Sequence, residues 1–350
     1  MQLKTMRAIR QSRFGGPEVL ELVSMPRPEP RATEVLVRVT AAGVNPIDWK
    51  TRSGYGEMDE PPFTVGWDVA GTVEAVGSGV TRFAVGDRVF GMPEFPREAG
   101  GYAQYVTARA RHLAKMPEGL GFINAAAMPL SSLIAWQSLV DTAAVSRGDR
   151  VLIQGAAGGV GHLAVQIAKS LGAYVLGSCA TRDVALLHEL GADEAIDFTR
   201  QDVAQTVHDV DVVLDLVGGP VSMASLPLLR DGGLLITVPS FTDLVPIREA
   251  AGDRVRVTGI LVEPDHTGME AIARLTAQGK LRVRVAHVFP LEDAARAHDL
   301  GETGAARGKI VLTAGAWARM PTQWSATRHT TVHSRSIPLP LVAPPRQATA

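Results

Sequence analysis

The sequence predicts an α/β protein in which a small β-barrel is followed by a doubly wound parallel sheet. Three observations support this fold class. Short runs of strand character, separated by glycine and proline, fill roughly residues 7–120. From about residue 126 to 275, apolar runs alternate with segments of helical periodicity, as in consecutive βαβ units. A glycine-rich turn at residues 155–161 joins the first of these apolar runs to a helix.

The barrel strands are predicted from five runs that are apolar or alternate between apolar and polar residues. These runs cover residues 19–23, 34–40, 69–76, 86–91 and 102–106. Helical character begins at Phe122 and a helix over residues 131–140 leads into the second domain. Later segments, a strand at 281–289, a helix at 291–300 and a strand at 308–313, are expected to return to the barrel.

Three regions of the chain follow from this reading. We predict a barrel domain at residues 1–125, completed by 281–314, and a domain of βαβ units at 126–280. Residues 315–350 show no sustained periodicity and become proline-rich, so a disordered tail is expected.

The parallel sheet is predicted to begin with residues 151–153, an apolar run typical of a strand buried on both faces. A helix over 160–171 follows and ends at Gly172. Further strands are expected at 174–177, 211–215, 234–238 and 254–262. Because the last of these would leave an apolar edge, we predict a homodimer joined through residues 254–262.

The glycine-rich turn has the composition of a pyrophosphate site. Glycine lets the backbone approach phosphate oxygens, and the free N–H groups and dipole of a helix N-terminus favour negative charge. Ala156 replaces the first glycine of the strict G-x-G-x-x-G pattern, so a plain tight turn is the alternative. The βαβ units downstream favour a dinucleotide site, whose predicted residues are Gly155, Ala157, Gly158, Gly159, Val160 and Gly161.

Composition excludes several functions. The net charge of −1 gives no electrostatic support for binding nucleic acid or a membrane surface. One cysteine excludes an intramolecular disulfide and suits a reducing compartment. The N-terminus lacks the apolar core of a signal peptide, and no apolar run approaches the roughly 20 residues that span a bilayer. We therefore expect a cytoplasmic protein.

Six separated motifs resemble the medium-chain dehydrogenase/reductase superfamily, and within it the zinc-independent quinone oxidoreductase branch. They are residues 42–50 (AGVNPIDWK), 66–73 (GWDVAGTV), 100–106 (GGYAQYV), 135–139 (AWQSL), 155–161 (GAAGGVG) and 305–312 (AARGKIVL). The resemblance covers about residues 6–314. It implies a GroES-like barrel beside a Rossmann domain, with the active site in the cleft between them.

The zinc ligands of alcohol dehydrogenases in this superfamily have no counterparts here. Asn45 stands where the first ligand would be, and Gly66-Trp67-Asp68 replaces a Gly-His-Glu sequence. Four cysteines for a structural zinc are absent, and the nine histidines are scattered and mostly expected at the surface. We predict no metal, which restricts the chemistry to acceptors that delocalise charge themselves, such as a quinone or an α,β-unsaturated carbonyl.

The catalytic candidates are Asn45, Lys50 and Tyr55, each with a structural alternative. The Asn45 amide suits a hydrogen bond to the nicotinamide ribose or to an acceptor oxygen, but it also suits a turn before proline. Lys50 lies where many quinone reductases carry tyrosine, so it either stabilises an enolate or faces solvent. Tyr55 is a second proton-donor candidate.

Four further side chains are expected to have structural roles. Asp48 and Asp68 are interpreted as turn and strand-end residues in preference to a general acid pair, and Tyr102 and Tyr105 as barrel core.

The cofactor is predicted to be NADPH from the end of the second strand of the nucleotide domain. Cys179 stands where NAD enzymes tend to place a carboxylate, which leaves room for a 2′-phosphate. Ser178 and Thr181 offer hydroxyl donors, and Arg182 offers a charged fork or is a surface residue at a helix start. Further predicted contacts are Val217, Val238 and Ser240, although the glycines near 217–219 also suit plain turns. Lys309 resembles the superfamily residue that returns to the cofactor cleft, which implies a contact with the cofactor.

Two functions from different classes remain at this point. The first is an NADPH-dependent oxidoreductase that transfers hydride to a quinone or enone. The second is an NADPH-binding structural or RNA-binding protein on the same fold, because a fold alone does not establish turnover.

Overall fold

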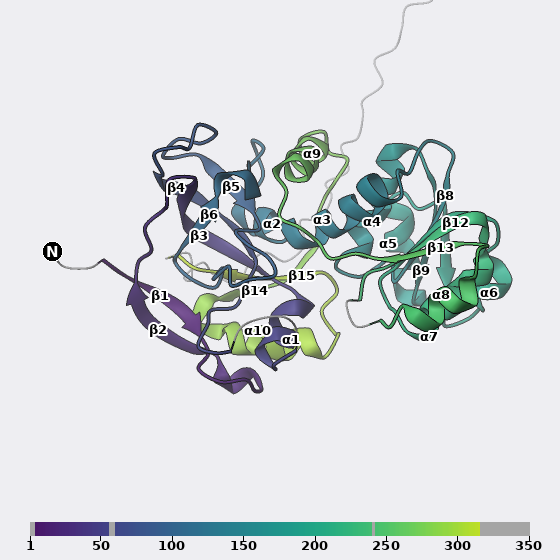
Figure 1. The fold of residues 1–350 in the computed structure, drawn as a ribbon, viewed down its shortest axis with the longest axis horizontal. Coiled ribbons are helices and arrows are strands. Elements are labelled where there is room, and N and C mark those ends of the chain that lie inside the picture. Colours follow the sequence, from purple (N-terminus) through teal and green to yellow (C-terminus); the bar gives the residue numbers. More distant parts are fainter. Residues whose placement is uncertain (1–3, 56–59, 240–241, 316–350) are drawn as a thin grey trace, which may run out of the picture. The chain divides into compact units, whose positions relative to one another are not determined.

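A computed structural model describes residues 4–55, 60–239 and 242–315. The described residues belong to one compact unit that contains three sheets (Figure 1). Of the predicted tail, residues 315–350, the structure describes only Gly315. The domain boundaries at residues 125 and 280 remain a prediction.

A seven-stranded mixed sheet forms the barrel part and takes strands from both ends of the chain. Its order is β14-β15-β3-β4-β5-β7, with β6 paired to β3. The strands are β3 (Glu34–Val44), β4 (Asp68–Val76), β5 (Arg88–Gly91), β6 (Tyr105–Arg109), β7 (Leu113–Lys115), β14 (Val285–Pro290) and β15 (Lys309–Thr313). A separate hairpin pairs β1 (Thr5–Arg10) with β2 (Glu21–Pro26).

Strand β15 pairs antiparallel with the second half of β3, with Ile310 opposite Val44 and Thr313 opposite Ala41. Its other edge pairs in parallel with β14. This register brings Lys309, the first residue of β15, next to the end of β3 and the start of α1 (Pro46–Arg52).

The second large sheet has six parallel strands in the order β10-β9-β8-β11-β12-β13. They are β8 (Arg150–Gln154), β9 (Tyr174–Cys179), β10 (Glu194–Asp197), β11 (Val210–Asp215), β12 (Leu229–Thr237) and β13 (Arg256–Gly259). Counted from β8 this is the 3-2-1-4-5-6 order of a Rossmann fold. The predicted doubly wound sheet is therefore confirmed.

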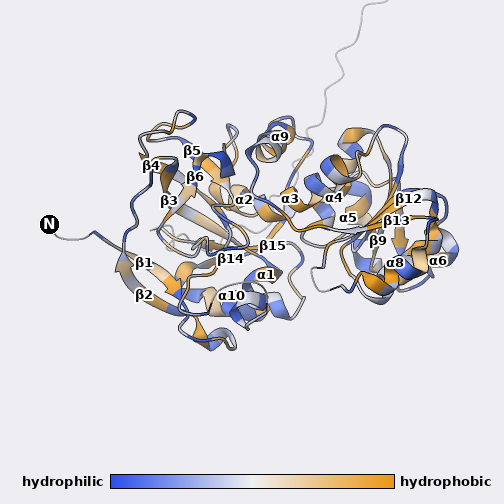
Figure 2. Ribbon diagram, in the orientation of Figure 1, coloured by the Kyte–Doolittle hydropathy of each residue, from blue (hydrophilic) through white to orange (hydrophobic). Residues whose placement is uncertain are grey.

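Helices cover both faces of the parallel sheet (Figure 1). Val151 and Ile153 pack on one face with α4, while Leu152 packs on the other with α8. Figure 2 shows apolar residues along the strands of both large sheets. The helices of this region are α3 (Pro129–Trp136), α4 (Gly161–Leu171), α5 (Val184–Glu189), α6 (Val203–Thr206), α7 (Pro220–Ser225), α8 (Val245–Ala251) and α9 (His266–Ala277).

The remaining helices are α2 (Phe122–Ala126), α10 (Ala294–Glu302) and six short segments. These are η1 (Pro17–Val19), η2 (Ala110–His112), η4 (Thr181–Asp183), η5 (Leu226–Leu228), η6 (Leu291–Asp293) and a π-helical segment, η3 (Gln137–Thr142). Among the described residues, no helix combines the length and apolar character needed to cross a membrane.

Four strands begin or end at residues other than those predicted, each for a structural reason. The run at 19–23 begins as the short helix η1, so β2 starts at Glu21. The run at 102–106 becomes a strand only at Tyr105, because Tyr102 pairs its backbone with Val65 and Ile9. The edge strand ends at Gly259, since residues 260–262 line a cavity instead. The strand predicted from 281 begins at Val285, because side chains of α4 bind the backbone of residues 282–284.

Candidate active site

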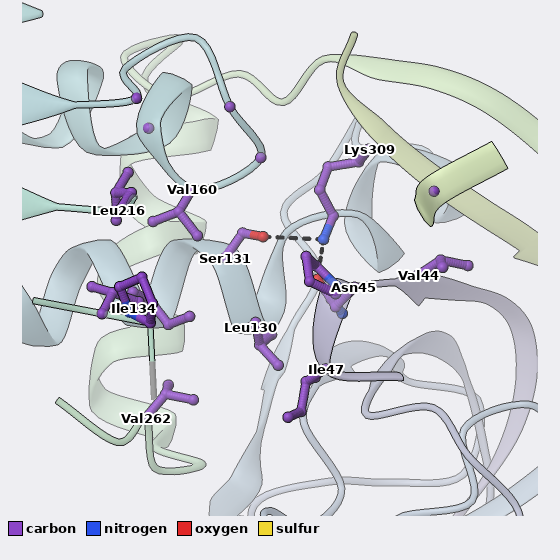
Figure 3. A pocket seen from close by; sticks show the side chains of 18 of the residues that line it. Val44, Asn45, Ile47, Leu130, Ser131, Ile134, Val160, Leu216, Val262 and Lys309 are labelled. Carbon is purple, nitrogen blue, oxygen red and sulfur yellow. Dashed lines mark hydrogen bonds between the residues drawn. The ribbon is translucent and has the colours of Figure 1, made fainter. Parts of the chain in front are cut away.

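A cavity of about 480 Å³ lies between the glycine-rich turn and the start of α1 (Figure 3). Most of its wall is apolar, and the polar groups are few, as is typical of a small-molecule site. The predicted site residues that line it are Asn45, Lys50, Gly155, Gly158, Gly159, Val160, Gly161, Val238 and Lys309. Further walls come from Ile47, Trp49, Phe95, Leu130, Ile134, Leu216, Ile260 and Val262.

The other predicted site residues in the described part of the chain do not line this cavity. Tyr55 is 47% exposed, which weakens its assignment as a proton donor to a bound acceptor. Ser240 lies outside the described residues. Those remaining are Ala157, Ser178, Cys179, Thr181, Arg182 and Val217.

The glycine-rich turn has the geometry of an anion cradle. Gly155 adopts a positive φ of 72°, which favours glycine, and a Cβ at Gly161 would clash with the Gly155 carbonyl oxygen. The backbone amides of Gly159 and Val160 have no acceptor among the described residues. These amides at the start of α4 fit the pyrophosphate of a dinucleotide.

Ser178 supports the glycine-rich turn through two hydrogen bonds. Its hydroxyl accepts the Gly155 amide proton at 3.1 Å, and its carbonyl accepts the amide of Ala156 at 2.9 Å. The buried Ala156 lies over Gly177, where a Cβ would come within 2.8 Å of the alanine Cβ. The hydroxyl predicted to hold a 2′-phosphate therefore faces the turn.

His162 fixes the turn from the other side and was not predicted. Its Nδ1 is 2.9 Å from the Gly158 carbonyl and so carries the proton, while Nε2 accepts the Arg284 amide at 3.2 Å. Burial lowers the pKa of this imidazole to about 4. One turn further along α4, the Gln166 amide both donates to and accepts from the backbone of Arg282, at 2.9 Å each.

Most histidines were expected at the surface, and three of the seven in the described part of the chain are exceptions. His112, His162 and His298 are buried, because each finds polar partners inside the fold.

Lys309 forms the polar floor of the cavity (Figure 3). Its ammonium donates to Asn45 Oδ1 and, at 3.0 Å, to Ser131 Oγ, and it lies 3.9 Å from Asp68 Oδ2. Asp68 also accepts the Asn45 side-chain amide at 2.8 Å and the Leu130 backbone amide at 2.8 Å. Burial raises the pKa of Asp68 and lowers that of Lys309, while their mutual attraction opposes both shifts.

A chain of hydrogen bonds continues from this floor into the barrel. Asp48 Oδ2 accepts the Asn45 backbone amide at 2.6 Å and the Tyr102 hydroxyl at 3.0 Å. The Tyr102 oxygen lies 3.2 Å from His298 Nε2, and Arg52 is 3.3 Å from His298 Nδ1. Because arginine can only donate, His298 Nδ1 accepts and Nε2 carries the proton.

This arrangement fixes the roles of the buried acid and tyrosine. Burial, aided by Asp68, raises the pKa of Asp48 to about 7. The Tyr102 hydroxyl was predicted to be ordinary barrel core, yet it orients Asp48, which in turn caps α1. Arg52 completes the chain with a 2.5 Å contact to Glu302, whose side chain reaches the surface.

At the end of the site predicted to bind adenosine, Asp197 on β10 provides a carboxylate that was not predicted. Thr181, predicted to bind a phosphate, instead donates its hydroxyl to Asp197 at 2.5 Å. Burial, with Asp183 and Asp197 nearby, raises the pKa of the Cys179 thiol to about 11. The Arg182 side chain is 61% exposed and 3.6 Å from Asp183. Because β10 has polar ends and was not predicted, its carboxylate was missed.

The residues at the vacant zinc position do not fit a metal ion. The Asn45 oxygen is occupied by Lys309, and the buried Trp67 donates its indole N–H to the Arg97 carbonyl at 2.9 Å. Within the part of the chain that the structure describes, no three His, Cys, Asp or Glu side chains are grouped as metal ligands.

Known proteins resemble this chain over most of its length. Residues 31–118 match the alcohol dehydrogenase GroES-like domain, and residues 190–312 match a family described as zinc-binding dehydrogenase. A quinone oxidoreductase from Lama guanicoe is 36% identical over 325 residues, covering 88% of this chain and 98% of the relative. The chloroplastic NADPH-dependent alkenal/one oxidoreductase of Arabidopsis thaliana is 32% identical, covering 88% and 80%.

Solved structures give the same result. The quinone oxidoreductase of Coxiella burnetii has a TM-score of 0.83 at 38% identity, covering 89% of this chain and 99% of that one. The Escherichia coli quinone oxidoreductase complexed with NADPH has a TM-score of 0.79 at 30% identity, covering 89% and 100%.

The fold and the cavity thus define an oxidoreductase that uses a nicotinamide nucleotide. The chain belongs to the quinone oxidoreductase family of the medium-chain dehydrogenase/reductase superfamily.

Proposed function

We propose that this protein uses NADPH to reduce a quinone or an α,β-unsaturated carbonyl compound. The observation that carries the proposal is the meeting of two features in one cavity. The amides of Gly159 and Val160, which have no acceptor in the described part of the chain, lie on one wall, and the Lys309 and Asn45 polar cluster lies on another. Relatives named quinone oxidoreductase and alkenal/one oxidoreductase support this substrate class.

A bound NADPH would supply the hydride. The glycine-rich turn would hold the pyrophosphate through its amides and the N-terminus of α4. Val238 and Leu216, at the ends of neighbouring strands, would flank the nicotinamide half. The apolar walls around Trp49, Phe95 and Ile134 would exclude water and receive a flat, apolar acceptor.

The choice of NADPH over NADH is supported by the strand end at Cys179. This thiol is buried and stays neutral at pH 7, since its pKa is raised. The nearest strand-end carboxylate, Asp197, has its oxygens bound by Thr181 and Thr199. Three of the roughly four acceptor positions of this carboxylate are thereby occupied, which leaves little capacity to hold both ribose hydroxyls as an NAD-type carboxylate does.

Steady-state NADPH oxidation tests the proposal with a panel of benzoquinones, naphthoquinones, enals and enones. We expect turnover with at least one of these classes and little with saturated ketones. Tight NADPH binding, measured by cofactor fluorescence, without turnover on any acceptor would instead support the structural or RNA-binding alternative. The relatives, which are named as oxidoreductases, do not favour that alternative.

A further inference from the structure

The buried ammonium of Lys309 is held in one place by the fold. Gly308, with a φ of 136°, allows the chain to enter β15 closely against Arg284, whose carbonyl accepts the Lys309 amide at 2.8 Å. The aliphatic part of the side chain runs beside the glycine-rich turn, since a Cβ at Gly159 would lie 3.6 Å from Lys309 Cδ. The ammonium thus reaches the cavity along the wall assigned to the cofactor.

Two of the three N–H donors of this ammonium have good acceptors. Asn45 Oδ1 and Ser131 Oγ take them, as Figure 3 shows. Asp68 Oδ2, at 3.9 Å, balances the charge but is too far for a hydrogen bond. Among the described residues the third N–H has no acceptor within hydrogen-bond distance, and Lys309 lines the cavity.

We propose that Lys309 is a catalytic residue whose ammonium binds the carbonyl oxygen of the acceptor and stabilises the negative charge that hydride transfer places there. This inference rests on the proposed function. It changes the role predicted for Lys309 from holding the cofactor to activating the acceptor. Asp68 and Asn45 are positioning residues, because they act through the lysine.

With an enone as the acceptor, a bound NADPH would supply the hydride and become NADP⁺. The new C–H bond would form at the β-carbon while the C=C electron pair moves to give an enolate. Lys309 donates a hydrogen bond to the enolate oxygen and keeps its proton. A proton from solvent then adds at the α-carbon. Removing a preorganised donor of this kind lowers kcat by roughly 10²–10³-fold.

The acceptor class provides an internal comparison. An enone places most of the developing charge on one oxygen, so it needs the cation strongly. A quinone spreads the charge over its ring and second oxygen, so it needs the cation less. A residue that only holds the cofactor would affect both acceptors equally.

The experiment measures kcat with an enone and with 1,4-benzoquinone at saturating NADPH for the wild type, Lys309→Met and Lys309→Arg. We expect Lys309→Met to lower kcat about 100- to 1000-fold with the enone. With the quinone, the fold-decrease in kcat should be at least ten times smaller. Lys309→Arg, which keeps a cation, should have a kcat with the enone at least tenfold higher than that of Lys309→Met. The dissociation constant for NADPH, measured by fluorescence, should change by less than about threefold.

Lys309→Met leaves Asp68 buried without its counter-charge and is the variant at risk of misfolding. The double variant Lys309→Met/Asp68→Asn removes both charges and should show the same enone-selective loss. Lys50→Met tests the other lysine of the cavity, and a larger enone-selective loss there would overturn the assignment. So would weaker NADPH binding with unchanged kcat, or equal losses for both acceptors. A wild type that binds NADPH but reduces neither acceptor would refute the proposed function itself.

Discussion

The imidazole of His162 should make the stability of the protein depend on pH in a predictable way. In the folded protein its Nδ1–H donates to Gly158 and its Nε2 accepts from Arg284. A second proton on Nε2 would face the Arg284 amide and break that bond. His162→Gln removes the titrating group while keeping a polar side chain of similar length.

The sign and size of the effect follow from the two pKa values. The unfolded imidazole binds its proton below a pH of about 6.5, whereas the folded one does so only near pH 4. Between these values the unfolded state binds more protons, so stability is lost as the pH falls. At about 1.4 kcal/mol per pKa unit, the titration of His162 should lower the free energy of unfolding by about 3 kcal/mol between pH 7 and pH 4. Asp48 and His298 titrate in both proteins and cancel in the difference.

Urea unfolding followed by tryptophan fluorescence, at pH 7 and pH 4, measures this difference. The stability of the wild type relative to His162→Gln should fall by about 3 kcal/mol between the two pH values. His188→Gln, a substitution of an exposed histidine on α5, is the matched control and should track the wild type. Parallel pH dependence of the wild type and His162→Gln would refute the assignment of a neutral, doubly bonded imidazole.

Three further predictions concern the cofactor, assembly and metal. Arg182→Ala should raise the NADPH KM by about 1.4- to fivefold and leave the NADH KM unchanged, because an exposed ion pair is worth about 0.2–1 kcal/mol; equal changes would remove Arg182 from phosphate binding. Sedimentation at micromolar concentration should show a homodimer joined at the open edge of β13, and a monomer contradicts this. Prolonged chelation should leave activity intact, whereas stoichiometric zinc whose removal abolishes turnover would reverse the metal-free reading.

The sequence was sufficient for the elements whose signals are local. Apolar runs located β8, β9, β11 and β12, and the predicted stop of α4 at Gly172 is confirmed by its φ of 88°. The glycine-rich turn could be assigned because strand, turn and helix start are consecutive in the chain.

The polar floor of the site could not be predicted in the same way. Lys309 and Asn45 are 264 residues apart, and no periodicity or spacing links them. Asp48, Tyr102 and His298 likewise come from three distant segments, and each fits a bland role when considered alone. His162 carried one weak signal, since with Gln166 it puts two polar side chains four residues apart within the otherwise apolar stretch 161–168 of α4.

The position of β15 between β14 and β3 has a consequence for the order in which the protein is made. Residues 41–44 of β3 cannot complete their pairing until residues 310–313 have been synthesised, and the whole parallel sheet lies between them in the chain. At roughly 5–20 residues per second this interval lasts tens of seconds on the ribosome. The parallel sheet can therefore close first, while the barrel stays incomplete until β15, which begins with Lys309, has been synthesised. Ribosome-bound chains that end before residue 309 should accordingly bind chaperones through the exposed edge of β3.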